Sequence, residues 1–244
     1  MNIISIENLI YNLDNFILEI EKLNIKKGEK VAILGENGSG KSTFLNIISG
    51  YYKTEKKVKI KDKYIEEINS SHRAKLIAYL PQFSEILFNY TVYETVLMGR
   101  FPHVNEFDFS ERDHNNTNKV IKMFHLDDYR DKLFVKLSGG EKKRVMLARI
   151  FNQDSEIILL DEPFASLDVK HSIHLGKILK KLNKTVITIV HDINIAKDIA
   201  NRLIFLKNGK IISNITREEL NNEILFKVFD VEFKCINNYY FINI

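Results

Sequence analysis

The sequence lacks the features that indicate secreted proteins, proteins stabilised by bound metal, or membrane-spanning proteins. Its 244 residues include a single cysteine, Cys235, which excludes a disulfide within the chain and a zinc site built from cysteines. No stretch approaches the roughly 18 consecutive apolar residues that indicate a membrane-spanning helix. Residues 1–10 place no basic residue before their apolar positions, so we expect no secretory signal. Any role at a membrane is therefore expected to run through partners.

The chain also lacks a surface stripe of one charge. Its 36 Lys and Arg residues are interleaved with 32 Asp and Glu residues, and the net charge is +4. The densest basic stretch, 53–63, also carries acidic residues, which favours a solvated strand face over a nucleic-acid site. Hydrophobic residues make up 45% of the chain. This content is enough for the core of one large α/β domain, or of a domain with a subdomain.

A glycine-rich segment between two apolar runs carries the strongest functional signal. The run 31–34 predicts a strand and the run 44–48 a helix, and the segment between them has the pattern G-x-x-x-x-G-K-[ST]. Glycines let the backbone wrap around phosphate oxygens, a lysine can reach the β- and γ-phosphates, and a hydroxyl can bind Mg²⁺. The residues of this predicted nucleotide loop are Gly35, Glu36, Asn37, Gly38, Ser39, Gly40, Lys41, Ser42 and Thr43. The chain is therefore predicted to bind a nucleoside triphosphate.

A pair of carboxylates ends a second buried strand. The apolar run 157–160 leads directly into Asp161 and Glu162. Open α/β sheets bind ligands at the carboxyl ends of their strands. Asp161 is suited to hold Mg²⁺, and Glu162 is suited to polarise an attacking water molecule.

The order of patterns along the chain predicts an α/β fold with a mainly parallel sheet. Buried strands are expected at 30–34, 76–80, 157–160 and 186–190, alternating with helices at 41–49, 141 to about 152, and 170–182. Half-buried antiparallel strands are expected at 2–9 and 16–25, and a hairpin with an Asn-Gly turn at 202–212. Residues from about 84 to 135 read as a mainly helical insertion.

A third motif connects these patterns with a family. It consists of Leu137, Ser138, Gly139, Gly140 and Glu141. Together with the two motifs above, it resembles the signature sequence of the ATP-binding subunits of ATP-binding cassette (ABC) transporters. The resemblance implies a P-loop ATPase that uses ATP and Mg²⁺. It also implies a head-to-tail homodimer, in which the signature of one copy closes over the γ-phosphate held by the other.

Other positions that matter in this family are present in order. Tyr11 matches an aromatic residue that stacks on adenine, although Phe16 competes for this role. Gln82 matches a glutamine that reaches Mg²⁺ and the attacking water, and His191 matches a histidine that contacts the γ-phosphate. Ser166, Leu167 and Asp168 match a loop that crosses the dimer interface in the family. The resemblance thus implies catalysis by Lys41, Gln82, Glu162 and His191, and metal binding by Ser42, Gln82 and Asp161.

The same resemblance implies one ABC ATPase domain over 1–244. Residues 1–83 and 136–215 are expected to form a RecA-like core with an antiparallel β subdomain. Residues of about 84–135 would form an α-helical subdomain, and about 216–244 a C-terminal packing segment. The implied partners are membrane permease subunits and, indirectly, a substrate-binding protein, with no nucleic acid. The implied location is the cytoplasmic face of the cell membrane, as a peripheral subunit.

The stretch 91–103 resembles ATPases of iron–siderophore, haem and vitamin B12 importers. ATPases of zinc and manganese importers have similar stretches, so this alternative stays open. A third hypothesis is a soluble ABC ATPase of iron–sulfur cluster assembly, because 141–144 is reminiscent of that group. ABC proteins that act on DNA or ribosomes need a long coiled-coil insertion or a second cassette, and the chain has neither.

Overall fold

The computed structural model describes residues 1–82, 89–104 and 108–243. The chain forms two compact units. Unit 1 comprises Met1–Ile68 and Leu175–Ile244, and unit 2 comprises Asn69–His174. The division expected from the sequence, with limits near 84, 135 and 216, stays a prediction, and Phe83 and the start of the expected helical insertion lie outside the described residues.

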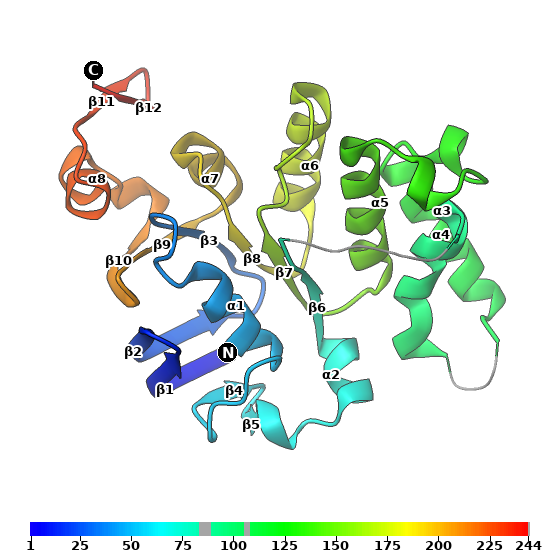
Figure 1. The fold of residues 1–244 in the computed structure, drawn as a ribbon, viewed down its shortest axis with the longest axis horizontal. Coiled ribbons are helices and arrows are strands. Elements are labelled where there is room, and N and C mark those ends of the chain that lie inside the picture. Colours follow the sequence, from blue (N-terminus) through cyan, green and yellow to red (C-terminus); the bar gives the residue numbers. More distant parts are fainter. Residues whose placement is uncertain (83–88, 105–107, 244) are drawn as a thin grey trace. The chain divides into compact units, whose positions relative to one another are not determined.

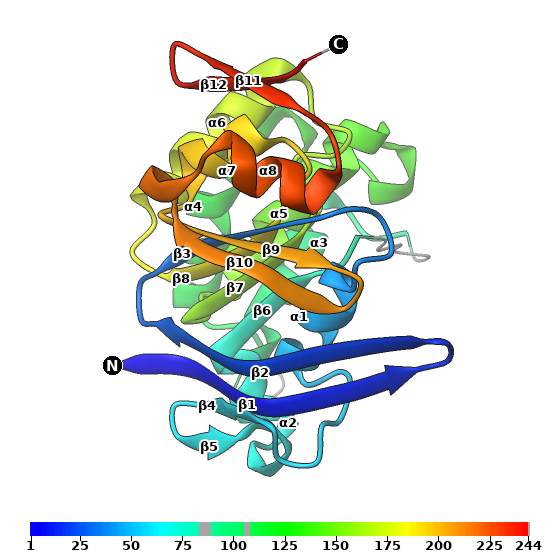
Figure 2. The same cartoon turned by 90° about the vertical axis from the view of Figure 1, so that its left-hand side faces the viewer.

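Unit 1 is built on a mixed sheet with the order β5-β4-β1-β2-β10-β9-β3-β8. The long antiparallel hairpin β1–β2 is seen from the side in Figure 2. Strand β3 pairs in parallel with β8 on one side and β9 on the other. The strands of unit 1 are β1 Asn2–Leu13, β2 Phe16–Lys26, β3 Lys30–Leu34, β4 Val58–Ile60, β5 Lys63–Tyr64, β8 Thr185–Ile189, β9 Arg202–Lys207, β10 Lys210–Thr216, β11 Phe233–Ile236 and β12 Tyr239–Ile242.

The core of unit 1 lies between this sheet and its helices. Strand β3 is buried from Val31 to Leu34, because both of its neighbours are strands and helices cover its side chains. The helices are α1 Lys41–Ser49, α7 Ile193–Ile199 and α8 Asn222–Phe229, with short 3₁₀ turns η1 Ile65–Glu67 and η5 Arg217–Glu219. Helix α8 and the β11–β12 hairpin close the chain, and the Tyr240 hydroxyl donates to the Leu220 carbonyl at 2.6 Å.

Unit 2 combines a parallel strand pair with most of the helices (Figure 1). Its strands are β6 Ile77–Leu80 and β7 Ile157–Asp161. Its helices are α2 Ser70–Leu76, α3 Val92–Leu97, α4 Glu111–Met123 and α5 Gly139–Asn152, with 3₁₀ turns η2 Met98–His103, η3 Asp127–Tyr129 and η4 Phe134–Lys136. Helix α6, Val169–Lys181, runs from unit 2 into unit 1. Within the described ranges, no helix is long and apolar enough to cross a membrane.

The α/β class with antiparallel strands at the N-terminus is confirmed. Helix α1 stops where expected, because Gly50 adopts the left-handed conformation that ends helices. Asn208 and Gly209 both have positive φ, as the tight hairpin turn between β9 and β10 requires. Residues 76–80 differ from the expectation in detail, since Leu76 ends helix α2 and the strand begins at Ile77.

Candidate active site

The glycine-rich loop follows β3 in unit 1, and its backbone conformation depends on glycine. Gly35, Gly38 and Gly40 have φ angles of 148°, 77° and 100°. A Cβ atom on Gly35 would lie 2.1 Å from the Leu206 carbonyl oxygen, so no larger residue fits this turn. The buried strand β3 thereby delivers the loop tightly against β9.

Helix α1 begins inside this loop without a side-chain cap. Its N-cap is Gly40, which has no side chain to accept hydrogen bonds from the first turn. The Lys41 ammonium donates to the carbonyls of Gly35 at 2.9 Å and Glu36 at 2.7 Å, so it lies across the loop. The buried Ser39 hydroxyl oxygen has no hydrogen-bond partner among the described residues. Uncapped amides, an ammonium and a buried hydroxyl together suit a phosphate chain.

The parallel pairing of β3 and β8 brings His191 to the same edge of the sheet as the loop. Ile33 is in register with Ile189, and the Val190 amide donates to the Ile33 carbonyl at 3.2 Å. His191 follows on an exposed turn, and Asp192 caps helix α7 by accepting from two amides of its first turn. The structure therefore brings the predicted loop and the predicted histidine together within unit 1.

The two aromatic candidates for the nucleotide base occupy different places. The Phe16 ring is packed on the loop, since a Cβ on Gly40 would lie 2.6 Å from its Cζ atom. Tyr11 is half-buried and pairs directly with Leu18 across the β1–β2 hairpin. Its ring is stacked on Tyr52, with centroids 5.3 Å apart. Phe16 thus supports the loop, and the assignment of the base to Tyr11 stays a prediction.

The predicted catalytic carboxylates lie in unit 2 beside the predicted glutamine. Strands β6 and β7 run in parallel with Leu80 opposite Leu160, so Gln82 and Glu162 leave the sheet at one edge. The Gln82 side-chain amide donates to a Glu162 carboxylate oxygen at 3.0 Å. Asp161 is 1% exposed. Glu162 has a φ of 48°, a left-handed conformation that is uncommon outside glycine and that clusters at functional sites.

Lys143 is a charged neighbour of these carboxylates that the motifs did not single out. Burial lowers the pKa of its ammonium, and the negative charges of Asp161 and Glu162 act in the opposite direction. Lys143 lies on α5, two residues after Glu141, the last residue of the signature. The basic run 142–144 was the visible signal, but it does not say that Lys143 approaches these carboxylates while Arg144 is buried against the carbonyls of Phe124 and His125.

The signature forms the start of helix α5. Ser138 is the N-cap, and its hydroxyl accepts from the Glu141 amide while the Glu141 carboxylate accepts from the Ser138 amide at 2.7 Å. These bonds lower the pKa of Glu141. Leu137 is buried, whereas a Cβ on Gly139 would meet open space.

The predicted dimer loop lies against the signature in unit 2. A Cβ on Gly140 would be 2.8 Å from the carbonyl oxygen of Ser166, so the two backbones are in close contact. Ser166 has a φ of 65°, and Leu167 continues the turn with its amide on the Phe164 carbonyl. The Asp168 carboxylate accepts from the His171 amide at 2.8 Å at the start of α6.

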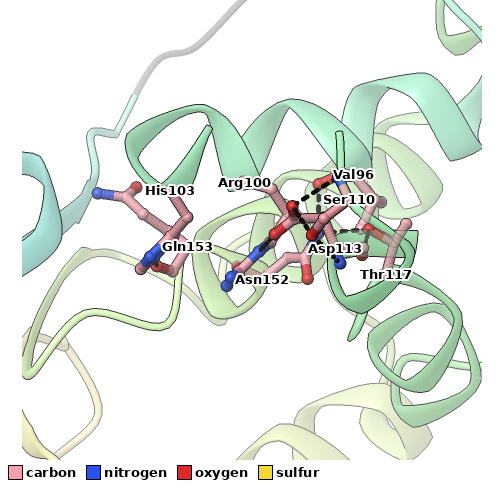
Figure 3. A network of polar contacts seen from close by, with 8 residues as sticks. All are labelled: Val96, Arg100, His103, Ser110, Asp113, Thr117, Asn152 and Gln153. Atoms are coloured by element: carbon pink, nitrogen blue, oxygen red, sulfur yellow. Dashed lines mark hydrogen bonds and ion pairs between the residues drawn. The ribbon is translucent and has the colours of Figure 1, made fainter. Parts of the chain in front are cut away.

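A buried polar network, which sequence reasoning missed, fixes the other end of α5 (Figure 3). The Arg100 guanidinium forms an ion pair with Asp113 at 2.7 Å and donates to the Asn152 carbonyl at 2.9 Å. The Asn152 amide donates to the Val96 carbonyl and the Thr117 hydroxyl. Arg100 belongs to the stretch that resembles iron-chelate importers, so this part of the resemblance rests on residues that hold unit 2 together.

Three more contacts lie beside this network. The His103 ring is 2.8 Å from the Gln153 carbonyl, and the Gln153 amide donates to the carbonyls of Ala74 and Ile77. Burial alone would raise the pKa of Asp113, but hydrogen bonds from Ser110 and the ion pair with Arg100 outweigh it and lower the pKa to about 2. The carboxylate is therefore ionised at neutral pH.

The donors predicted for Mg²⁺ have the chemistry that this ion prefers. They are one carboxylate, one amide and one hydroxyl, all oxygen ligands. In the part of the chain that the structure describes, no group of three or more His, Cys, Asp or Glu is arranged to hold a metal. A nucleotide-bound Mg²⁺ takes most of its ligands from phosphate and water, so a dedicated cluster is not required.

A phosphate loop at one strand end and paired carboxylates at another define a P-loop nucleotide-binding protein. A model of the ABC transporter family matches residues 18–165, more than half of the chain. The chain therefore belongs to the ABC transporter family, and it is an ATP-hydrolysing subunit of that family.

Three relatives illustrate the similarity. A petrobactin import ATP-binding protein of Bacillus subtilis is 34% identical, over 88% of this chain and 87% of the relative. An iron(3+)-hydroxamate import ATP-binding protein of the same organism is 32% identical, over 98% and 91%. A hemin import ATP-binding protein of Gloeobacter violaceus is 36% identical, over 81% and 75%.

Two solved structures share the fold. A metal-chelate type ABC transporter in an inward-facing conformation matches with a TM-score of 0.82 and 26% identity, over 100% of this chain and 96% of that chain. A dimeric ATP-binding cassette bound to ADP and Pi matches with a TM-score of 0.78 and 30% identity, over 89% and 100%. The expected family and fold are thus confirmed.

Proposed function

We propose that this chain is the ATPase subunit of an importer for iron chelates of the siderophore, haem or cobalamin type. The similarity to import ATPases for petrobactin, iron(3+)-hydroxamate and hemin carries this proposal. The transported chelate does not contact the ATPase in such an assembly, so its class is inferred through relatives. The chain would act as a peripheral subunit on the cytoplasmic face of the cell membrane.

ATP hydrolysis would need no covalent intermediate. Lys41 and the amides at the start of α1 hold the β- and γ-phosphates and offset their charge. Glu162 accepts a hydrogen bond from the attacking water and aligns it with the γ-phosphorus, and His191 contacts the γ-phosphate. The 3.0 Å bond from Gln82 to Glu162 supports this role, because it fixes the orientation of the Glu162 carboxylate.

Mg²⁺ would be held by Ser42, Gln82 and Asp161 together with phosphate oxygens. It would supply charge neutralisation on the β- and γ-phosphates. The lone pairs of Asp161 suit this role because its carboxylate is buried at a strand end, where a bound cation offsets the loss of hydration.

A complete site would need a second copy of the chain. The signature residues Ser138, Gly139 and Gly140 would close over the γ-phosphate of the partner, and Ser166, Leu167 and Asp168 would lie at the interface. The close approach of Gly140 to Ser166 supports this assignment, because it joins the signature and the dimer loop in one surface of unit 2. The dimeric cassette bound to ADP and Pi offers a precedent.

Opening and closing of the dimer would be transmitted to membrane permease subunits through Gln82 and the helical segments of unit 2. A substrate-binding protein would deliver the chelate to the permease. The contacts of η2 with α5 support this route, since Arg100 and His103 connect the two elements by hydrogen bonds. The similarity to a whole transporter of the metal-chelate type points the same way.

The catalytic part of the proposal is tested with Glu162→Gln. This variant should bind ATP and form a stable dimer in size-exclusion chromatography, while hydrolysis falls about 10²- to 10⁴-fold because the carboxylate no longer polarises the water. Hydrolysis at the wild-type rate would contradict the role of Glu162. Glu156→Gln, at a half-buried site just before β7, serves as a matched control and should retain activity.

The cargo is tested by reconstituting the chain with its permease in proteoliposomes. Binding protein loaded with an iron chelate should stimulate ATP hydrolysis and drive uptake of the chelate. Stimulation by zinc- or manganese-loaded binding protein would instead assign the transporter to metal ions. Purification with scaffold proteins of iron–sulfur assembly, and without a permease, would overturn the importer.

A further inference from the structure

A stack of tyrosine rings lies beside the phosphate loop in unit 1. The rings of Tyr11 and Tyr52 are nearly parallel, with an interplanar angle of 18° and centroids 5.3 Å apart. Tyr51 lies against Tyr52 at the same centroid distance but tilted by 53°, and it is 76% exposed. The pairing joins the β1–β2 hairpin to the end of helix α1, two segments far apart in the sequence.

The backbone holds Tyr52 firmly in this position. Gly50 ends helix α1 in the left-handed conformation. The amides of Tyr51 and Tyr52 both donate to the Asn46 carbonyl, at 3.0 and 3.2 Å. The residue that stacks on Tyr11 therefore lies three residues after the last residue of the helix that begins at the phosphate loop.

A second set of contacts connects Tyr11 with the start of helix α1. A Cβ on Gly40 would lie 3.1 Å from a methyl group of Leu18, so Leu18 covers the start of α1. Tyr11 is opposite Leu18 in the hairpin register, and directly opposite residues project from the same face of a sheet. A nucleotide with its phosphates at α1 would thus extend its base toward the half-exposed ring of Tyr11.

We propose that Tyr52 is a positioning residue that holds the Tyr11 ring as a platform for the nucleotide base. An aromatic ring has two faces, and Tyr52 stacks on one of them, so a purine would stack on the other. An unsupported Tyr11 ring would lose rotational freedom when the base binds, whereas a ring already fixed by stacking loses less. This inference rests on the proposed nucleotide role of Tyr11 and extends it to a residue of another element.

The test compares ATP with inorganic triphosphate, which lacks a base, by isothermal titration calorimetry on the full chain. Tyr52→Leu should weaken ATP binding about three- to tenfold, the size expected for loss of one aromatic pair. Triphosphate binding should be unchanged, because the phosphate loop is intact. Tyr52→Phe should restore ATP binding, since it keeps the ring. Tyr64→Leu, a half-buried tyrosine of β5 beside Lys59, is the matched control and should bind both ligands normally.

Each contrary result has a definite meaning. Equal or tighter ATP binding by Tyr52→Leu would overturn the inference, and tighter binding would show that Tyr52 obstructs the base. Parallel loss of ATP and triphosphate would show a purely structural role and would also overturn it. An unchanged ATP affinity in Tyr11→Leu would show that Tyr11 does not contact the base, and would overturn the inference. A wild-type chain that binds neither ligand would instead overturn the proposed nucleotide site.

Discussion

Two helices start at residues predicted to meet phosphate, and they start differently. Helix α1 begins after Gly40, which offers no side chain to its first turn. Helix α5 begins after Ser138, which forms a complete capping box with Glu141. The N-terminus of α1 therefore has no side-chain cap, whereas that of α5 is stabilised by its own chain. We therefore expect a bound phosphate to stabilise the start of α1, and the signature helix to stay folded without nucleotide.

The contacts that fix the phosphate loop differ in kind from those that fix helix α5. In unit 1 the loop is shaped by glycines with positive φ that pack against the Leu206 carbonyl and the Phe16 ring. In unit 2 the far end of α5 is fixed by charged side chains, through Arg100, Asp113 and Asn152. We therefore expect the phosphate loop to be most sensitive to changes in backbone shape. The far end of α5 should be most sensitive to changes in side-chain charge.

The largest effect is expected from breaking the buried ion pair of unit 2. Arg100→Met leaves the Asp113 carboxylate buried without its cation, because both side chains are at most 6% exposed. The free energy of unfolding should fall by about 3–5 kcal/mol. Urea denaturation followed by circular dichroism measures it.

The double variant Arg100→Met with Asp113→Leu separates charge from packing. Replacing both partners with apolar groups removes the uncompensated charge, and most of the lost stability should return. A double variant as unstable as Arg100→Met would mean that shape, and not charge, holds the end of α5. The contrast between the units would then be wrong.

The next effect concerns backbone shape at the phosphate loop. Gly40→Ala places a Cβ 2.6 Å from the Phe16 ring, at a φ of 100° that alanine rarely adopts. We expect ATP affinity to fall roughly 100-fold, which corresponds to about 2.7 kcal/mol. Calorimetric titration with ATP measures this loss.

Gly28→Ala is the control for the glycine prediction. Gly28 has a φ of 81°, but its added Cβ would meet no atom within 4 Å. It should lower stability by about 1–2 kcal/mol through the left-handed conformation alone and leave ATP affinity unchanged. Equal loss of ATP binding in both variants would show that general destabilisation, and not the shape of the loop, explains the effect.

The sequence could predict the features that neighbouring residues determine, but not those that depend on how distant segments pack. The loop 35–43, the strand that ends at Asp161 and the turn at Asn208 are encoded by neighbouring residues, so their patterns were readable. The pairing of Arg100 with Asp113 depends on how η2 and α4 pack, and no periodicity in the sequence reports it. The stacking of Tyr11 on Tyr52 likewise joins residues that only the fold brings together.

Helix α2 shows the limit of local reasoning. Its seven residues, 70–76, are mostly polar and lack an apolar stripe, so hydrophobic periodicity could not reveal it. It is stabilised by a cap, because the Asn69 side chain accepts from the His72 amide at 2.8 Å. It is also held by tertiary contacts, since the Gln153 amide donates to the Ala74 carbonyl. The second of these signals was not available before the structure.

A smaller effect is expected from acid. The pKa of Asp113 is about 2 in the folded chain, below its ordinary value of 3.8, so the unfolded chain binds this proton first. The stabilisation is complete above about pH 4 and is lost as the pH falls toward 2. It amounts to roughly 2 kcal/mol. Denaturation of the wild type and of the double variant at pH 5 and pH 2.5 measures it, and an equal acid sensitivity of both proteins would contradict the assignment to Asp113.

The smallest effect tests the cap of the signature helix. Ser138→Ala removes the hydroxyl that accepts from the Glu141 amide, and the free energy of unfolding should fall by about 1 kcal/mol. Ser138→Asp should retain most of the stability, because a carboxylate also caps a helix, but its negative charge would repel a phosphate. If the signature meets the partner's γ-phosphate, Ser138→Asp should abolish the ATP-bound dimer in a Glu162→Gln background, while Ser138→Ala only weakens it. Equal dimerisation by the two variants would mean that α5, unlike α1, keeps its N-terminus for its own cap alone.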